Sequence, residues 1–303
     1  MGWANSKDVS WRFSTWTFCA LTTACGSSAA ISTNAALLPA LDAGASSDAM
    51  IAAGDAAGDG TVCSVPDVGA VLSSEAGAVW PSPCPAPPAA CRILPLGDSI
   101  TDGFSVPGGY RVPLFHRILS VGQHATFVGS QMNGPAEVDG VPFPPDHEGH
   151  VGFAIFPFPG REGISSFTTD ALVNYKPHIV ALMIGTNDLD LKNDVANAPQ
   201  RLGALLDLIF QKAPTVTVVL AQITPSDDDA LNQLVSTYNH AMPAIVAARV
   251  SAGNHVQLVD MYGAFTSVPC YRTVLMSDRL HPNAAGYAVM ADVWYGALGA
   301  ILK

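Results

Sequence analysis

Between residues 91 and 303, short apolar runs alternate with helical patterns, which restricts the chain to a small set of folds. The run Ile179–Ile184 is hydrophobic at every position, as is typical of a strand covered on both faces. Five strands alternating with helices predict a parallel sheet in a three-layer α/β/α sandwich. The expected strands are Arg92–Leu96, Ala125–Val128, Ile179–Ile184, Thr215–Gln222 and His255–Val259, and the expected helices are Arg111–Val121, Ser165–Asn174, Ala198–Lys212, Ala230–Ala248 and Ala284–Leu302.

The composition is that of a globular protein with few charges. The chain has 303 residues, of which 49% are hydrophobic and 13% charged, and its net charge is −11. Ordinary soluble domains carry roughly 25% charged residues. Because an acidic chain gains nothing electrostatically from phosphate backbones, we expect no nucleic-acid partner. No apolar run reaches the ~18–20 residues of a membrane-spanning helix, so a multi-pass membrane protein is not expected.

The N-terminal residues 1–24 resemble an export signal. Two basic residues precede the apolar stretch Phe13–Ala24, which suits a signal peptide and is too short to cross a membrane. Cys25 ends a sequence similar to a bacterial lipoprotein box, although Thr22 stands where leucine is usual. Three interpretations stay open: a lipoprotein anchored through lipidated Cys25, ordinary secretion, and no export. Either form of export predicts a secreted protein or an outer-membrane or cell-surface lipoprotein.

Residues 26–90 have a different composition from the rest of the chain. They contain six acidic residues, no Lys or Arg, and Trp80 as their one aromatic residue. A segment with so few large apolar side chains cannot offset the entropy of ordering, so we expect it to be mostly disordered, with an extended Pro-rich end. It is interpreted as a tether for the domain at residues 91–303. A binding segment in its own right is the alternative.

Six cysteines in an exported chain predict disulfides rather than a metal site. One leaves with the signal, and Cys25 is lipidated or removed. The other four allow three pairings, which the sequence does not separate: Cys63, Cys84, Cys91 and Cys270. Since no pair has the two-residue spacing of a zinc site, no structural metal is expected.

A serine follows the first predicted strand. The segment Leu96–Gly103 places Ser99 where a strand turns into a helix, so that its hydroxyl can lie beside free backbone N–H groups. Thr101 replaces the second glycine of a Gly-x-Ser-x-Gly nucleophile elbow, so that motif is absent. A nucleophile and an ordinary Asx-type turn are both consistent with this segment alone.

Two further segments lie at the same end of the predicted sheet, where active residues of such folds gather. Asn187 follows the third strand, where its carboxamide can donate to a developing oxyanion or simply make a turn. After the last strand, Asp278 precedes His281 by three residues, close enough to orient the imidazole while the other ring nitrogen faces Ser99. A lone His-Pro pair is also a common helix start. Each of the three segments alone is weak evidence for a catalytic site, but their common position at one end of the sheet makes them strong evidence together.

With these segments the chain resembles the SGNH (GDSL-type) hydrolases, and more narrowly their acetyl xylan esterase branch. The resemblance covers about residues 92–300. It rests on Gly97-Asp98-Ser99, Gly185-Thr186-Asn187-Asp188 and Asp278-x-x-His281, and for the branch on Gly108-Gly109-Tyr110-Arg111, Phe127-Val128-Gly129-Ser130-Gln131, His147-Glu148-Gly149-His150-x-Gly152, Ala221-Gln222-Ile223-x-Pro225 and Leu280-His281-Pro282-Asn283. It implies a flavodoxin-like SGNH fold and a serine esterase without metal or organic cofactor.

The resemblance also implies residue roles. Ser99 would be the nucleophile, His281 the general acid and base, and Asp278 the residue that orients His281. The oxyanion hole would consist of the backbone N–H groups of Ser99 and Gly152 and the side chain of Asn187. Gly129 is the rival glycine, and Gly152 is preferred because it follows the His-Glu-Gly-His run.

The chain departs from the branch at residues 153–163. Phe153 stands where tryptophan is usual, and a Pro- and Gly-rich insertion follows it. Its aromatic residues are expected to pack a local lid onto the sheet or to form a hydrophobic substrate rim. The histidines of the preceding His147–His150 run are three apart among Pro and Gly, so the run is not a helical zinc motif. Tyr110 and Arg111 are expected to start a helix near the site, with substrate contact as the alternative.

The sequence thus predicts an extracellular, monomeric serine esterase for short acetyl esters, acting on a polysaccharide such as xylan through an acyl-enzyme. The alternatives are a lipase, lysophospholipase or aryl-esterase of the same fold, and a catalytically idle surface or carbohydrate-binding module. The complete set of catalytic-type residues argues against the idle module. The residues that bind the substrate are not assigned by the sequence.

Overall fold

The computed structural model describes residue 63 and residues 80–303. The predicted signal peptide (1–24), the lipidation site Cys25 and most of the predicted tether (26–90) lie outside the described residues. Among the described residues, no helix combines the length and the apolar character needed to cross a membrane.

The five predicted strands form a parallel sheet, which confirms the predicted fold class. The sheet order is β2-β1-β7-β8-β9. All side chains of β7 and β8 are buried, which explains their uninterrupted hydrophobicity. The observed bounds are β1 Cys91–Gly97, β2 Ala125–Phe127, β7 Ile179–Met183, β8 Thr217–Ala221 and β9 Val256–Val259.

An additional strand, β6 (Asp146–Gly149), pairs with the end of β1 and was not predicted. β7 runs along one edge of β1, whereas β2 pairs with the beginning of the other edge and β6 with its end. The sequence of β6 gave no strand signal because its His and Glu are polar, although both are buried. The remaining short strands are β3 (Gln131–Met132), antiparallel to β6, and the hairpin β4 (Glu137–Val138) and β5 (Val141–Pro142).

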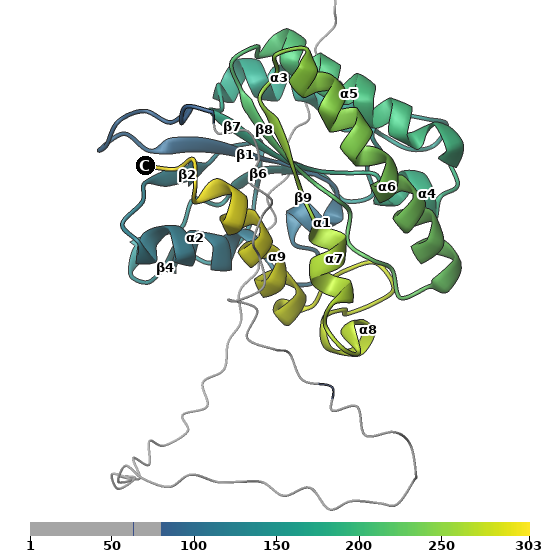
Figure 1. Cartoon of the computed structure of the whole chain (residues 1–303). Coiled ribbons are helices and arrows are strands. Elements are labelled where there is room, and N and C mark those ends of the chain that lie inside the picture. Colours follow the sequence, from purple (N-terminus) through teal and green to yellow (C-terminus); the bar gives the residue numbers. More distant parts are fainter. Residues whose placement is uncertain (1–62, 64–79) are drawn as a thin grey trace, which may run out of the picture. The chain divides into compact units, whose positions relative to one another are not determined.

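Helices cover both faces of the sheet (Figure 1). α3, α5 and α6 pack together on one face, and α2, α7 and α9 pack on the other. The long helices lie within a few residues of the predicted ranges, and α9 is shorter at its end because a turn follows Leu298. The bounds are α1 Ser99–Asp102, α2 Arg111–Ser120, α3 Ser165–Tyr175, α4 Thr186–Asp190, α5 Ala198–Lys212, α6 Asp229–Ser251, α7 Met261–Thr266, α8 Tyr271–Val274 and α9 Ala284–Leu298, with a 3₁₀ turn, η2, at Val195–Asn197.

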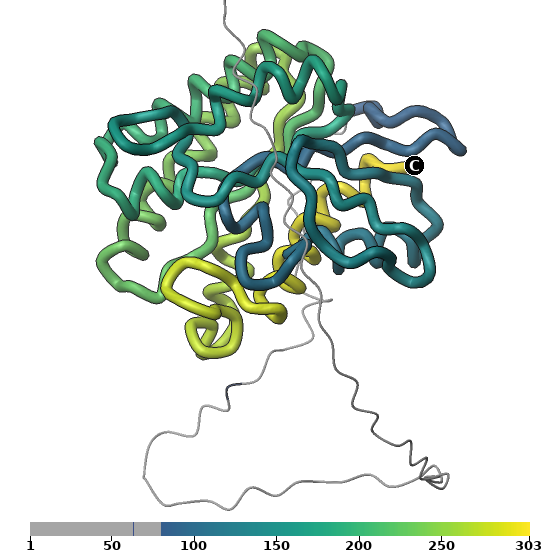
Figure 2. The backbone as a smooth tube through the Cα atoms, turned by 180° about the vertical axis from the view of Figure 1, so that it is seen from behind, coloured from purple at the N-terminus to yellow at the C-terminus, as the bar shows by residue number. Residues whose placement is uncertain are grey.

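Two disulfides resolve the pairing that the sequence left open: Cys63–Cys270 and Cys84–Cys91. Cys84 is buried, Trp80 stacks on His255, and the Lys303 ammonium donates to the Cys84 carbonyl. Seen from behind, the segment that leads into β1 lies beside the C-terminus (Figure 2). The structured part therefore begins before residue 91. The end of the predicted tether packs on the domain instead of forming a free spacer, because the Cys84–Cys91 bond and these contacts hold it there.

Candidate active site

Ser99 is the first residue of α1 and follows the tight turn that ends β1. A Cβ atom on Gly97 would lie 2.3 Å from the Met183 carbonyl oxygen, so only glycine fits between the neighbouring strand and α1. The Asp98 side chain caps α1 by accepting from the Ile100 N–H at 3.0 Å. Burial raises the pKa of Asp98 to about 6. The turn thus presents the Ser99 hydroxyl at a helix N-terminus, where backbone N–H groups have no partner within the helix.

Ser99, His281 and Asp278 form a continuous hydrogen-bonded chain. The Ser99 Oγ lies 2.9 Å from the Nε2 of His281, and the His281 Nδ1 lies 2.8 Å from the Oδ2 of Asp278. A carboxylate on one ring nitrogen makes that nitrogen the protonated one and leaves the other as an acceptor for a hydroxyl proton. The side chains of Ser99, His281 and Asp278 are therefore adjacent, in the geometry of a serine–histidine–acid triad.

Asp278 is held by more than the imidazole. Its Oδ1 accepts from the backbone N–H groups of Leu280 and His281, each at 2.8 Å. Partial burial favours a higher pKa, but these bonds and the contact with His281 outweigh it and lower the pKa of Asp278 below its ordinary value. Asp278 is therefore ionised at neutral pH. On the other side, the exposed Phe104 ring packs against His281 with centroids 4.5 Å apart, a contact that no sequence signal predicted.

Asn187 lies in the first turn of α4, directly after β7. Gly185 precedes α4 with φ of +130°, and a Cβ atom there would collide with the Tyr238 ring. The Asn187 Nδ2 donates to the Phe153 carbonyl at 2.9 Å. Because an amide nitrogen carries two hydrogens, the second is free for another acceptor. The next residue, Asp188, is buried, which raises its pKa.

Gly129 and Gly152, the two candidate glycines of the oxyanion hole, have different surroundings. Gly129 is packed against the backbone of His147, whose carbonyl carbon would lie 2.2 Å from a Cβ atom on it. Gly152 has a φ of +78° and directly precedes Phe153, whose carbonyl binds Asn187. The His150 N–H donates to the Gly97 carbonyl at 3.0 Å, which carries this segment across the end of β1. Gly152 is therefore the candidate that lies on the segment joining β1 to Asn187.

The His147–His150 run braces the site. Glu148 is buried and accepts from the Ser130 N–H at 2.7 Å, and the Nε2 of His150 lies 2.7 Å from its other oxygen. Burial, with smaller contributions from Arg111 and His150, lowers the pKa of His147 to about 3, so this side chain is neutral. Within residues 63 and 80–303, no three metal-ligating side chains gather in a cluster.

Tyr110 and Arg111 are buried, which excludes the alternative of substrate contact. The Arg111 guanidinium donates to the carbonyls of Pro145 at 2.9 Å and Asp102 at 3.2 Å. It thereby joins the end of α1 to the segment that leads into β6. Burial lowers its pKa to about 10, so Arg111 remains charged at neutral pH. Nothing in its sequence neighbourhood predicted this bracing role.

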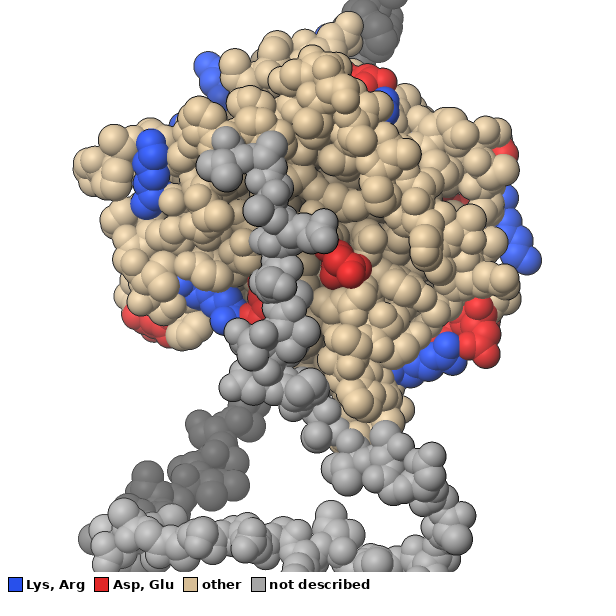
Figure 3. All heavy atoms as spheres, viewed as in Figure 1, with Lys and Arg blue, Asp and Glu red and all other residues tan. Residues whose placement is uncertain are grey.

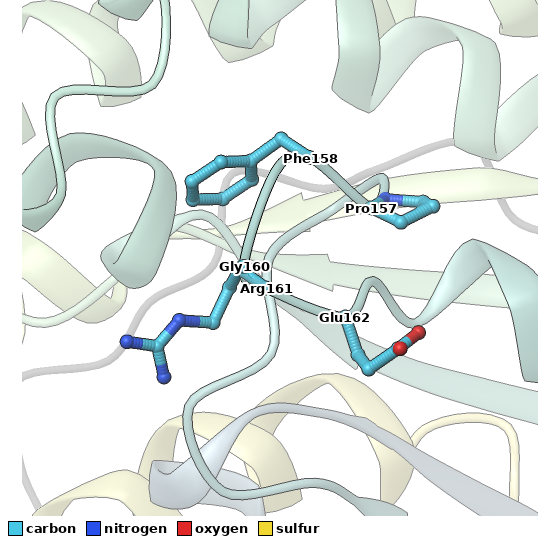
Figure 4. A pocket seen from close by; sticks show the side chains of 5 residues that line it. All are labelled: Pro157, Phe158, Gly160, Arg161 and Glu162. Carbon is cyan, nitrogen blue, oxygen red and sulfur yellow. The ribbon is translucent and has the colours of Figure 1, made fainter.

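The insertion at residues 153–163 is a fixed hairpin. Phe158 and Arg161 exchange backbone hydrogen bonds of 3.0 and 2.8 Å, and the Ala154 N–H donates to the Glu162 carbonyl. The Ile155 N–H donates to the buried carboxylate of Asp188 at 2.9 Å, which anchors the hairpin to α4. Its outer residues line a surface depression of about 390 Å³ (Figure 4).

The family model of the GDSL-like lipase/acylhydrolases matches residues 96–289, a stretch that contains Ser99, Asn187, Asp278 and His281. The chain belongs to this family. This confirms the resemblance to the GDSL-type hydrolases that was drawn from the motifs.

Solved structures of carbohydrate esterases are similar to this GDSL-like hydrolase. A family 3 carbohydrate esterase from Clostridium thermocellum is 32% identical with a TM-score of 0.57, and the match covers 68% of this chain and 94% of that one. A family 3 carbohydrate esterase from Talaromyces cellulolyticus is 26% identical with a TM-score of 0.58, and the match covers 70% of this chain and 98% of that one.

A multidomain esterase from Ruminococcus flavefaciens is 27% identical over 229 residues, which are 70% of this chain. The match spans 29% of that relative's own length.

Proposed function

We propose that the enzyme is a serine esterase in which Ser99 is the nucleophile, His281 the general acid and base, and Asp278 the residue that orients His281. The continuous chain of hydrogen bonds from Ser99 through His281 to Asp278 carries this proposal. In the first step the Ser99 Oγ attacks the ester carbonyl and its proton passes to the Nε2 of His281. That proton then leaves with the alcohol. Water activated by the same nitrogen releases the acid from the acyl-enzyme.

The oxyanion of each tetrahedral intermediate would be bound by the backbone N–H groups of Ser99 and Gly152 and by the Nδ2 of Asn187. Two observations support this set. Ser99 is the first residue of α1, so its backbone N–H has no acceptor within the helix, whereas the next N–H, that of Ile100, is bonded to Asp98. The Asn187–Phe153 hydrogen bond brings Asn187 beside the segment that contains Gly152.

The substrate we propose is a short acyl ester, an acetyl group, on a polysaccharide such as xylan. The two similar carbohydrate esterases support a sugar ester. The face seen in Figure 3 has its charged side chains singly or in small groups. The export of the chain and the lipidation of Cys25 stay predictions, since both depend on residues outside the described ones.

Initial rates of the full chain on acetylated xylan and on p-nitrophenyl esters from acetate to decanoate test the proposal. Acetate release from xylan with a sharp loss of rate on long acyl chains supports it, and inactivity on xylan with preference for long chains overturns it in favour of a lipase. Ser99→Ala should abolish turnover and leave the fold intact. Ser120→Ala, at the exposed end of α2, is the matched control and should be unaffected. Full activity in Ser99→Ala would show that Ser99 is not the nucleophile.

A further inference from the structure

Arg161, in the hairpin at residues 153–163, reaches over the proposed oxyanion glycine. Its Nη1 lies 2.9 Å from the position that a Cβ atom on Gly152 would occupy. The side chain is exposed, so the guanidinium can still contact a molecule from solvent. A positive charge therefore lies beside Gly152, the glycine that we propose for the oxyanion hole.

The charge of Arg161 is not neutralised by the chain. All the other arginines in the described residues use their guanidinium in a hydrogen bond or an ion pair, whereas that of Arg161 has neither. Glu162 is its neighbour, yet the two side chains point to different sides of the hairpin (Figure 4). An unpaired guanidinium stands out in a chain with 25 acidic and 14 basic residues.

The hairpin fixes the backbone that carries Arg161. Phe158 and Arg161 bond to each other through their backbones, and Ile155 is held by the Asp188 carboxylate. A Cβ atom on Gly163 would lie 2.2 Å from the Phe156 carbonyl carbon, so the hairpin strands approach closely. Arg161 also lines the depression of about 390 Å³, together with Pro157, Phe158, Gly160 and Glu162.

We propose that Arg161 binds a carboxylate of the substrate, so that the enzyme prefers acyl esters on acidic sugars, such as acetylated uronic acids, over esters on neutral sugars. This inference rests on the proposed esterase function. The planar guanidinium fork matches a carboxylate and can bind it through two parallel hydrogen bonds. Because the chain carries a net charge of −11, a local cation at the site also offsets repulsion of an acidic polymer.

A second role for the same charge would be to stabilise the oxyanion itself. The two roles differ in what they affect. A group that acts on the oxyanion lowers kcat for every ester when it is removed, whereas a group that binds a substrate carboxylate raises KM for the acidic substrate alone.

The test uses two substrates that differ only in the charged group: methyl 3-O-acetyl-glucuronoside, and methyl 3-O-acetyl-glucoside, which has a hydroxymethyl group in place of the carboxylate. p-Nitrophenyl acetate serves as a small neutral ester. The variants are Arg161→Gln, which removes the charge, and Arg161→Lys, which keeps it. Lys212→Gln is the matched control, because it makes the same change of net charge. Lys212 is the exposed last residue of α5, shortly before β8 begins, and so lies at the end of the sheet opposite to the proposed active site.

In Arg161→Gln we expect KM for the glucuronoside to rise about three- to tenfold, the range for one solvent-accessible charge-assisted contact. The kinetics on the glucoside and on p-nitrophenyl acetate should be unchanged, and Lys212→Gln should match the wild type on all three. Arg161→Lys should recover part of the lost affinity. Raising the ionic strength from about 0.05 to about 0.5 M should shrink the wild-type preference for the glucuronoside.

Equal loss of kcat on all three esters in Arg161→Gln would overturn the proposal, because the charge would then serve the oxyanion. Unchanged KM for the glucuronoside would overturn it as well. Failure of the esterase function itself is distinguishable, since wild-type protein would then be inactive on p-nitrophenyl acetate.

Discussion

At the scale of single residues, Asn187 connects binding of the transition state to the insertion hairpin. Its Nδ2 already donates to the Phe153 carbonyl, and one hydrogen remains for the oxyanion. Asn187→Ala should lower kcat on p-nitrophenyl acetate about 10²–10³-fold, the cost of one oxyanion donor. Circular dichroism and the melting temperature show whether the fold is retained. Unchanged kcat in a folded variant would remove Asn187 from the oxyanion hole.

Asp278 and His281 are expected to differ in how much activity each one carries. In Asp278→Asn the amide oxygen can still accept from the N–H groups of Leu280 and His281, so the loop geometry should persist. His281→Ala removes the base altogether. Asp278→Asn should therefore lose less kcat than His281→Ala, as measured on the same ester. Equal losses would contradict this ranking.

At the scale of elements, the turn from β1 to α1 makes the free energy of unfolding depend on pH, because it buries the Asp98 carboxyl. Burial raises the pKa of Asp98 from 3.8 to about 6. At a pH between these two pKa values, the Asp98 carboxyl has lost its proton in the unfolded chain but keeps it in the folded chain. The free energy of unfolding therefore falls as the pH rises from about 4 to 6. The raised pKa corresponds to about 3 kcal/mol of unfolding free energy, which is present at low pH and lost above the folded pKa.

Asp98→Asn tests this pH dependence, because asparagine is also a good helix cap and does not ionise. Relative to the wild type, the variant should gain about 2 kcal/mol of unfolding free energy between pH 4 and pH 7, because the unfolded chain has already released most of this proton at pH 4. Urea unfolding of both proteins at the two pH values measures the difference, in which the other titrating groups cancel. A difference that stays constant with pH would show that Asp98 is not protonated preferentially in the folded state.

At the scale of the whole molecule, the Cys63–Cys270 disulfide joins two residues separated by 207 positions, on either side of most of the domain. A bond that closes so long a loop restricts the unfolded chain strongly. The double variant Cys63→Ala/Cys270→Ala should lose about 2–4 kcal/mol of unfolding free energy in urea under non-reducing conditions. The single variant Cys63→Ala breaks the same bond and should lose the same amount. An unaltered midpoint and slope would show that the bond contributes nothing to stability.

Sequence pattern alone determined the parallel sheet and grouped Ser99, Asn187, Asp278 and His281 at one end of it. Both results follow from local rules: buried parallel strands are continuously hydrophobic, and side chains that follow such strands meet at one edge. The family resemblance supplied the roles expected of these residues.

Only the tertiary structure decided the strand β6, the pairing of the cysteines, the burial of Arg111 and the position of Arg161 over Gly152. Each of these depends on contacts between segments that are distant in the chain or folded back on each other. β6 has polar residues whose burial is made possible by partners elsewhere, such as Ser130 for Glu148. Local patterns record which residues favour the core or a turn, but they do not record which distant group lies opposite, because that is set when the segments pack together.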